Sequence, residues 1–315
     1  MHLPSAYGFP AAARSFYNRR MSASAHRLPP WVVSATPHLA ASDSLKRQLR
    51  QGRLVTVCEE ARCPNIGECF SSGTATFMLL GDTCTRRCQF CSVATGRPLP
   101  PDPDEPSRVA ETAAALGLRY IVVTTVARDD LADEGAGQFA ATITALHERI
   151  AGSQVEVLTA DFNGRRELIE QVLAARPEVF GHNMETVRRL TPEVRGRAKY
   201  ERSLEVLRIA AQAPRSDGCG VVKTGIMVGF GETRAEISET LRDIRATGCE
   251  LLTIGQYLRP TREHRPVSRY LPPEEFDELA CEARELGFSE VASGPLVRSS
   301  YRADRLYAAS AGPQR

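Results

Sequence analysis

From residue 74 to residue 258 the chain alternates strand-like and helix-like segments. Runs rich in β-branched residues or leucine predict six strands, at residues 74–80, 120–126, 155–158, 178–180, 221–228 and 251–258. Helical stretches separate them, near residues 108–116, 138–150, 165–175, 201–211 and 234–246. Strands that alternate with helices imply parallel pairing through right-handed crossovers. The sequence therefore predicts an α/β fold, a partial (β/α)6 barrel of parallel strands, because six strands are too few for a closed eight-stranded barrel.

The predicted helices contain their own start and stop signals. Thr233 and Glu236 form a capping box, and Gly248 supplies the stop. Proline at position 273 opens a further helix that ends at Gly287. A short helix is also expected at residues 44–50, before the first cysteine.

Composition and charge exclude two classes of partner. Forty basic and 38 acidic residues give a formal charge of +2 and form no long basic run, so we expect no nucleic-acid binding. The longest apolar runs are too short to cross a bilayer, so we expect no membrane span. No acidic residue precedes Asp43, which is typical either of an organelle transit peptide or of a disordered basic arm, and we favour the arm.

Six of the nine cysteines lie between Cys58 and Cys91. A secreted disulfide scaffold is usually short and has an even number of cysteines along its length, so crowded thiols favour metal binding instead. They form two triplets, Cys58, Cys63 and Cys69 with spacing C-x4-C-x5-C, and Cys84, Cys88 and Cys91 with spacing C-x3-C-x2-C. We expect Cys219, Cys249 and Cys281 to be packing residues or incidental thiols.

The number of thiols in each triplet, three, indicates the kind of metal site. A structural zinc site uses four ligands, and a simple electron carrier uses four thiolates for each cluster. Three thiolates leave one iron of a four-iron cluster open to another ligand, which is typical of a reactive metal site. A zinc ribbon, or a ferredoxin-like carrier completed by a distant cysteine, stays open as an alternative.

Polar and glycine-containing segments follow the predicted strands at the rim where a barrel of this type binds its ligands. Each segment alone is more typical of a turn, but their common location favours a site; they are residues 124–125, 159–161, 182–185, 229–232 and 255–257. The pair Arg86-Arg87 is expected either to tune the second triplet locally or to be solvated.

The spacing of Cys84, Cys88 and Cys91 after a strand resembles the radical S-adenosylmethionine superfamily, and Phe90 matches the aromatic residue usual before the last cysteine. Longer segments resemble the lipoyl synthases, namely residues 56–69, 84–88, 182–186, 223–232, 255–260 and 294–301. The resemblance runs from about residue 29 to residue 306, and its motifs occur in the family's order. It departs from the family at Ala127, Ala160 and Phe70, none of which is a proposed ligand.

This resemblance implies two 4Fe-4S clusters per chain and S-adenosyl-L-methionine. The second triplet would hold the radical-generating cluster, and the first triplet the auxiliary cluster, with Ser300 rather than Ser299 as its fourth ligand. Asn183 and Glu185 would bind the ribose hydroxyls of S-adenosylmethionine. We place Thr124, Gly229 and Gly231 among the further cofactor contacts.

The implied reaction is radical insertion of two sulfur atoms at carbons six and eight of an octanoyl group on a lysine of a lipoyl carrier domain, with sulfur from the auxiliary cluster. The implied partners are the E2 subunit of 2-oxoacid dehydrogenases and the glycine cleavage H protein, a reduced ferredoxin or flavodoxin-type donor, and an iron–sulfur carrier for cluster repair. Alternatives are sulfur insertion into a small molecule, as in biotin synthase, and a non-catalytic iron–sulfur electron carrier.

Four segments are expected: a flexible basic arm at residues 1–34, an extension with the auxiliary cysteines at 35–72, the barrel core at 73–288, and a C-terminal segment with the Arg-Ser-Ser-Tyr motif at 289–315. We expect a bacterial cytoplasmic location, or a mitochondrial or plastid one if the acid-poor start is a transit peptide.

Overall fold

The computed structural model describes residues 28–32, 47, 49–50, 52–60, 63, 65–71, 76–214 and 220–310. In this part of the chain one large sheet runs in the order β1-β2-β5-β6-β7-β8-β9-β10. Its strands are β1 Val55–Thr56, β2 Thr76–Leu79, β5 Tyr120–Thr125, β6 Gln154–Leu158, β7 Val179–Gly181, β8 Val221–Val228, β9 Leu251–Gln256 and β10 Glu290–Gly294. All neighbours are parallel except β1 and β2, and the described edge strands do not pair with each other, so the barrel is open.

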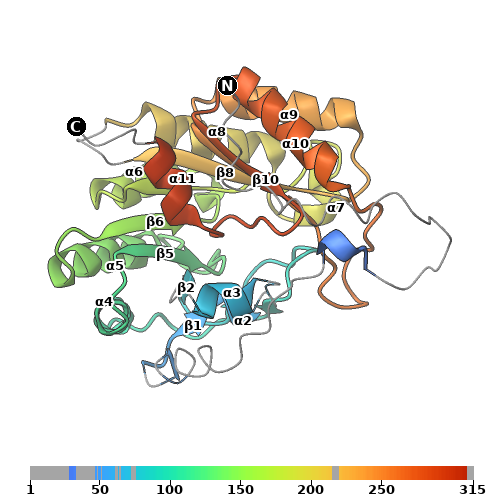
Figure 1. Cartoon of the computed structure of the whole chain (residues 1–315). Helices are drawn as coiled ribbons and strands as arrows, with labels where there is room; N and C mark the ends of the chain where they lie inside the picture. Colours follow the sequence, from blue (N-terminus) through green and yellow to red (C-terminus); the bar gives the residue numbers. More distant parts are fainter. Residues whose placement is uncertain are drawn as a thin grey trace.

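Helices cover the outer face of this sheet (Figure 1). They are α4 Glu105–Ala115, α5 Ala136–Arg149, α6 Arg166–Ala174, α8 Tyr200–Gln212, α9 Arg234–Ala246 and α10 Pro273–Glu285. The short α7 Thr191–Arg195 lies instead beyond the carboxyl ends of the strands, where Arg195 lines the cavity. The predicted capping box is present, because the hydroxyl of Thr233 accepts from the backbone of Glu236 and the Glu236 carboxylate accepts from the backbone of Thr233. Each of these helices except the short α7 was predicted from sequence periodicity or end signals.

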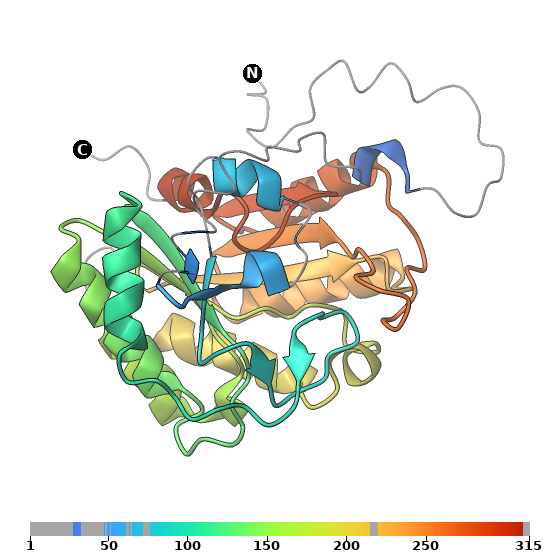
Figure 2. The same ribbon diagram turned by 90° about the horizontal axis from the view of Figure 1, so that it is seen from below.

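The opposite face of the sheet is covered by the two ends of the chain (Figure 2). The N-terminal extension contributes α2 Val57–Glu60 and α3 Ile66–Ser71, and the C-terminal segment contributes α11 Ala303–Ser310. Smaller elements are η2 Pro30–Val32, η3 Phe162–Gly164 and the pair β3 Thr83–Cys84 with β4 Ala94–Thr95. The concave side of the barrel is therefore enclosed by segments far apart in sequence.

Alternation along the strands separates the two faces, since successive side chains of a strand point to opposite sides. On β8, Gly225 and Met227 line the inner cavity, whereas Val222 and Val228 belong to the apolar core that includes buried helix residues. Thr124 at the end of β5 likewise lines the cavity. The sheet thus buries one apolar face under helices and presents a more polar face to the site.

The base of the barrel interior is closed by α11. Leu306 and Tyr307 pack in a small apolar cluster with residues of the strands. Beside this cluster Lys223 and Glu156 form a buried ion pair, with Nζ 2.8 Å from Oε1, and the Tyr120 hydroxyl donates to the same carboxylate at 2.6 Å. This region is filled, and the main cavity opens instead at the carboxyl ends of the strands.

Two strands of the large sheet differ from expectation. The six predicted strands are all present, but β1 and β10 were not predicted. The sequence of β10, Glu-Val-Ala-Ser-Gly, has no apolar alternation, and its pairing with β9 from Glu290–Leu251 to Gly294–Gly255 determines its conformation.

Part of the segment expected to be a flexible arm is packed. The Trp31 indole donates to the carbonyl of Leu271 at 2.9 Å, and Val32 is buried. Residues 1–27 and 33–34 of the expected arm, most of the helix expected at residues 44–50, and Cys219 lie outside the described residues. Across the ranges given above, no helix has both the length and the apolar character needed to span a bilayer.

Candidate iron–sulfur and cofactor site

One cavity of about 470 Å3 opens at the carboxyl ends of the strands. Its volume lies in the range of about 300–1,000 Å3 that is usual for cofactor and small-molecule sites. Its walls include five of the six clustered cysteines together with both serines of the C-terminal motif: Cys58, Cys63, Cys84, Cys88, Cys91, Ser299 and Ser300. The two triplets, which are separate in sequence, therefore face a single space.

Cys84 ends β3 and accepts two backbone hydrogen bonds. Its Sγ lies 3.4 Å from the backbone nitrogen of Arg86 and 3.3 Å from that of Ala127. Such N–H donors stabilise a thiolate and tune the reduction potential of an iron–sulfur cluster. The donor set at Cys84 therefore fits a cluster ligand.

Cys88 and Cys91 complete the loop on the same wall. Burial raises the pKa of the Cys88 thiol to about 12, although the nearby Arg195 guanidinium opposes this shift. Burial also raises the pKa of Cys91 to about 11, while a backbone hydrogen bond from Val93 acts in the opposite direction. Without a metal these thiols are protonated at neutral pH, so cluster binding must release protons.

The first triplet is held by α2 and α3. Burial and the neighbouring Cys63 raise the pKa of Cys58 to about 11, and burial with both other thiols raises that of Cys69 to about 12. These interactions place the three sulfur atoms close together, although Cys69 itself does not line the cavity. Burial raises the pKa of Cys63, and the charge of Arg298 acts against that rise.

The spacing of the ligand side chains bears on which metal group the site could hold. In the ranges that the structure describes, no three or more His, Cys, Asp or Glu side chains converge as a single ion would require. Ligands about 2.3 Å from one zinc would bring their sulfur atoms within about 4 Å of each other. A four-iron cluster is larger than one ion, so its thiolate ligands lie farther apart than those of a zinc site.

Asn183 and Glu185 follow β7 and lie next to the C-terminal motif. The Asn183 amide donates to Glu185 Oε1 at 3.0 Å and to Ser299 Oγ at 2.7 Å. Burial in this recess raises the pKa of Glu185, opposed by Arg195, Asn183 and Arg298. A carboxylate and an amide oriented together in this way can bind adjacent hydroxyl groups.

Gly225 leaves room for that group of side chains. A Cβ atom at this position would lie 2.6 Å from Thr253 Oγ1 and 2.9 Å from Asn183 Oδ1. Any larger residue would fill the recess. The glycine is therefore a close-approach position of the cavity wall, and the sequence analysis did not select it.

The other predicted cofactor contacts divide between two places. Thr124 lines the cavity, and its hydroxyl donates to the carbonyl of Leu158 at 2.9 Å. Gly229 and Gly231 instead border a separate small cavity of about 40 Å3. A Cβ on Gly229 would meet the Gln256 amide and the Arg269 carbonyl, so this glycine is needed for packing. The structure thus does not bring the two glycines to the wall of the main cavity.

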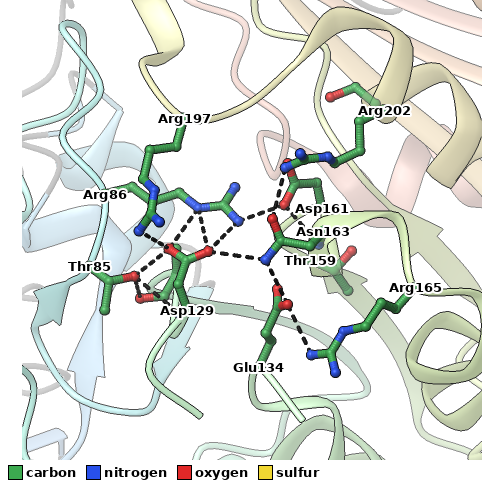
Figure 3. Close-up of polar contacts among 12 residues, drawn as sticks. Thr85, Arg86, Asp129, Glu134, Thr159, Asp161, Asn163, Arg165, Arg197 and Arg202 are labelled. Carbon is green, nitrogen blue, oxygen red and sulfur yellow. Dashed lines mark hydrogen bonds and ion pairs between the residues drawn. The ribbon is translucent and has the colours of Figure 1, made fainter. Parts of the chain in front are cut away.

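Beneath the cysteine loop lies a network of buried charges (Figure 3). The Arg86 guanidinium lies 2.6 Å from Asp129 Oδ1 and 2.7 Å from Asp161 Oδ1, and Arg86 is only 7% exposed. Thr85 donates to Asp129, and Arg202 approaches Asp161 from α8. Burial alone would raise the pKa of Asp161, but Arg86 and the other nearby cations hold it below the usual range. Arg86 is therefore a buried anchor and not the solvated charge considered from the sequence.

Two further arginines were missed by the sequence analysis. Arg195 is buried and donates to the Met184 carbonyl at 3.1 Å and to Ser203 at 2.7 Å, beside Cys88. Arg298 lies close to both Cys63 and Glu185. Arg298 belongs to the C-terminal Arg-Ser-Ser-Tyr motif, so the motif could have identified it. No local sequence signal distinguishes Arg195 from other helix arginines.

Comparisons with known proteins agree with this geometry. Residues 78–244 match the radical SAM superfamily, and residues 13–63 match the N-terminal domain of lipoyl synthase. The lipoyl synthase of Methylococcus capsulatus is 57% identical over 89% of this chain and 86% of its own length. The chain belongs to the lipoyl synthase family. The lipoyl synthase of Thermus thermophilus is 54% identical, with the same coverage of both chains.

Solved structures share the fold at low sequence identity. The hydrogenase maturase HydG has a TM-score of 0.52 and 14% identity, covering 82% of this chain and 57% of its own. Streptococcus suis SuiB bound to its precursor peptide has a TM-score of 0.51 and 11% identity, covering 87% and 55%. Membership of the lipoyl synthase family confirms two predictions, the partial-barrel fold and the activity of a radical SAM enzyme that inserts sulfur. It also confirms that the enzyme uses a 4Fe-4S cluster with S-adenosylmethionine and that its substrates are lipoyl domains.

Proposed function

We propose that the chain inserts sulfur at carbons six and eight of an octanoyl group on a lysine of a lipoyl carrier domain. The observation that supports this most is the cavity whose wall contains cysteines of both triplets and the serines of the C-terminal motif. A radical formed at one triplet would there be close to a sulfur donor held at the other. An electron carrier would have no need for this common space.

Cys84, Cys88 and Cys91 hold the radical-generating cluster in this proposal. When bound, that cluster supplies the electron that cleaves S-adenosylmethionine, and the resulting radical removes hydrogen from the substrate. The chain contributes binding, orientation and exclusion of water. Arg195 places positive charge beside Cys88, and the backbone donors of Arg86 and Ala127 stabilise the thiolate of Cys84.

Cys58, Cys63, Cys69 and Ser300 hold the auxiliary cluster, which is consumed as the sulfur donor. Ser299 already accepts from Asn183, whereas no described residue bonds the Ser300 hydroxyl. This difference supports Ser300 as the ligand. An alkoxide is a harder ligand than a thiolate and a poorer match for iron–sulfur chemistry, so this iron should be released most readily.

Asn183 and Glu185 bind the ribose of S-adenosylmethionine, and Thr124 contributes to the same wall of the cavity. The carrier substrates are the E2 subunit of 2-oxoacid dehydrogenases and the glycine cleavage H protein. A reduced ferredoxin or flavodoxin donates electrons, and an iron–sulfur carrier rebuilds the auxiliary cluster. We infer a bacterial cytoplasmic location, which N-terminal sequencing of the mature protein and fractionation would test.

Replacing Cys58 by Ala separates the two cluster roles. We expect iron to fall from about eight to about four atoms per chain, since each 4Fe-4S cluster holds four. The variant should still release 5′-deoxyadenosine, because the other triplet is intact, but should form no lipoyl product. Retained product would contradict a sulfur donor at this triplet.

The two competing functions are tested with wild-type protein. Release of 5′-deoxyadenosine is measured with an octanoylated carrier peptide and with the same peptide lacking octanoyl. We expect the octanoyl group to stimulate release. A lack of carrier dependence would favour a small-molecule substrate, and a lack of release would favour an electron carrier.

A further inference from the structure

The outer side of the cysteine loop presents exposed cations. Arg87 is exposed and directly precedes Cys88. The Arg197 side chain is 68% exposed, and Lys199 is exposed two residues further on. The backbones of these segments touch, since a Cβ on Gly196 would lie 3.3 Å from the Arg87 carbonyl oxygen. We call Arg87, Arg197 and Lys199 the basic patch.

Carboxylates near the basic patch are already paired with other cations. Asp129 is 3.7 Å from Arg197, but it is bound much more closely by Arg86. Figure 3 shows this arrangement, with Arg86 beside Asp129 and Arg197 above it. Glu193 is paired with Arg265 at 2.7 Å. The patch therefore keeps most of its positive charge.

The charge of this region is positive within a nearly neutral chain. Residues 85–91, 127–130 and 193–199 contain six cationic side chains and three carboxylates, and Asp161, which pairs with Arg86, is a fourth carboxylate, so the net formal charge is +2. The complete chain of 315 residues carries the same +2 over its whole length. A local positive potential of this kind attracts and orients an acidic partner.

The basic patch also lies directly behind a predicted cluster ligand. The Cys88 Sγ is 3.6 Å from the carbonyl oxygen of Arg195, which is two residues before Arg197. Arg87 is adjacent to Cys88, so their Cα atoms are about 3.8 Å apart. A protein bound here would be separated from the cluster by little more than the loop itself. The cavity on the inner side stays available for substrate.

We propose that the basic patch is the docking site of an acidic one-electron donor protein of the low-potential flavin or iron–sulfur class. The proposal rests on the proposed function, because that function requires reduction of the cluster at Cys84, Cys88 and Cys91. The donor is oxidised by one electron and the cluster is reduced by one, with no bond formed or broken. Such encounters use small interfaces, for which charge complementarity sets the association rate.

The test compares a protein donor with a small one. The double variant Arg87→Glu and Arg197→Glu is reduced either by reduced flavodoxin or by dithionite, and cluster reduction is followed by absorbance. We expect reduction by flavodoxin to slow about 10-fold or more at low salt, because steering changes association rates by factors of about 10–1,000. Reduction by dithionite should be unchanged. The affinity of the variant for flavodoxin, measured by calorimetry, should fall by a similar factor.

A matched control is the double variant Arg149→Glu and Arg242→Glu, which makes the same charge change at exposed positions on α5 and α9. It should behave as wild type with both reductants. Equal slowing with dithionite would show that the patch only maintains the loop, and unchanged flavodoxin kinetics would exclude docking; either overturns the proposal. A raised KM for the carrier domain with dithionite as reductant would reassign the patch to the carrier. The reduction rates and the affinity for flavodoxin do not depend on lipoyl formation, so a failure of the proposed function would be seen separately.

Discussion

The two cysteine triplets are attached to the barrel in different ways. The loop of Cys84, Cys88 and Cys91 is anchored by the buried Arg86, which bonds carboxylates that follow β5 and β6. The triplet of Cys58, Cys63 and Cys69 is attached mainly to the C-terminal segment. There the Asn65 amide donates to the Leu296 carbonyl at 2.6 Å, and Glu68 bonds Tyr301 and Arg302, each at 2.9 Å.

Burial distinguishes these attachments in energy. Arg86 and Asp161 have side chains that are 6% and 0% exposed, whereas those of Arg302 and Glu68 are 34% and 39% exposed. Breaking a buried pair typically costs about 3–5 kcal/mol, and an exposed pair contributes about 0–1 kcal/mol. Under the proposed function we expect the stronger attachment at the Cys84 loop, because the radical-generating cluster is permanent. The weaker attachment is expected at the first triplet, because the auxiliary cluster is lost and rebuilt in every cycle.

The largest effect is expected for Arg86→Met. This change leaves Asp161 buried without its main cation and should lower the free energy of unfolding by about 3–5 kcal/mol. Chemical denaturation measures the loss, and iron analysis should show poor loading of the Cys84 loop. Arg197→Met is the control, and because that side chain is exposed its effect should stay below about 1 kcal/mol. Similar small effects for both variants would remove the distinction between the triplets.

Low pH should lower the free energy of unfolding through protonation of His182, which lies on the same side of the site. Burial, assisted by the charge of Arg195, lowers its pKa to about 4, and its ring bonds the Thr159 carbonyl and the Ser203 hydroxyl. The unfolded chain binds a proton near pH 6.5 and the folded chain only near pH 4, so the free energy of unfolding falls as pH drops through this window. The whole contribution is about 3 kcal/mol, of which about 2 kcal/mol is lost between pH 7.5 and pH 5. Urea denaturation of wild type and His182→Asn at pH 7.5 and pH 5 measures it, and a gap that does not narrow at pH 5 would contradict it.

A smaller effect is expected where the first triplet meets the C-terminal segment. Asn65→Ala removes the donor to Leu296 and should cost about 1–2 kcal/mol, because a partly buried acceptor loses its partner. Asn65→Asp keeps the size but cannot donate when ionised, and it should be at least as destabilising. Both variants should bind less iron at the first triplet while still cleaving S-adenosylmethionine. Full iron content in both would show that this attachment is not needed.

The smallest effect is expected for Glu68→Gln. It removes a half-exposed ion pair with Arg302 and should cost less than about 1 kcal/mol. The difference from wild type should shrink as ionic strength rises, since salt screens exposed charges. Thermal denaturation at low and high salt measures this. A larger loss of stability that salt does not reduce would show that the Glu68–Arg302 pair acts as a buried ion pair does.

The sequence was sufficient to predict features that depend on local patterns. The six predicted strands and the longer helices follow from periodicity, and the capping box at Thr233 follows from two residues three positions apart. It failed where distant segments decide the structure. The strand β10 exists because β9 offers a free edge. Arg86 is buried by partners 43 and 75 positions later in the chain.

The candidate site shows the same limit. Its six cysteines were identified from spacing alone, and the structure brings five of them to the wall of one cavity, with Cys69 behind that wall. By contrast, the glycines at positions 229 and 231 matched a motif but follow the end of β8 and lie at another cavity, while Gly225 within β8 occupies the crowded position. Which glycine approaches a ligand depends on where β8 ends relative to the cavity. The motif alone does not reveal this.

The attachment of Asn65 to Leu296 joins positions that are 231 residues apart. The contacts that hold the first triplet can therefore form only after nearly the whole polypeptide has been synthesised. The Cys84 loop, in contrast, needs only the barrel. Metal loading is thus expected to follow an order, with the catalytic centre filled first. Proteolytic trimming from the C-terminal end would abolish sulfur transfer while radical formation continued without it.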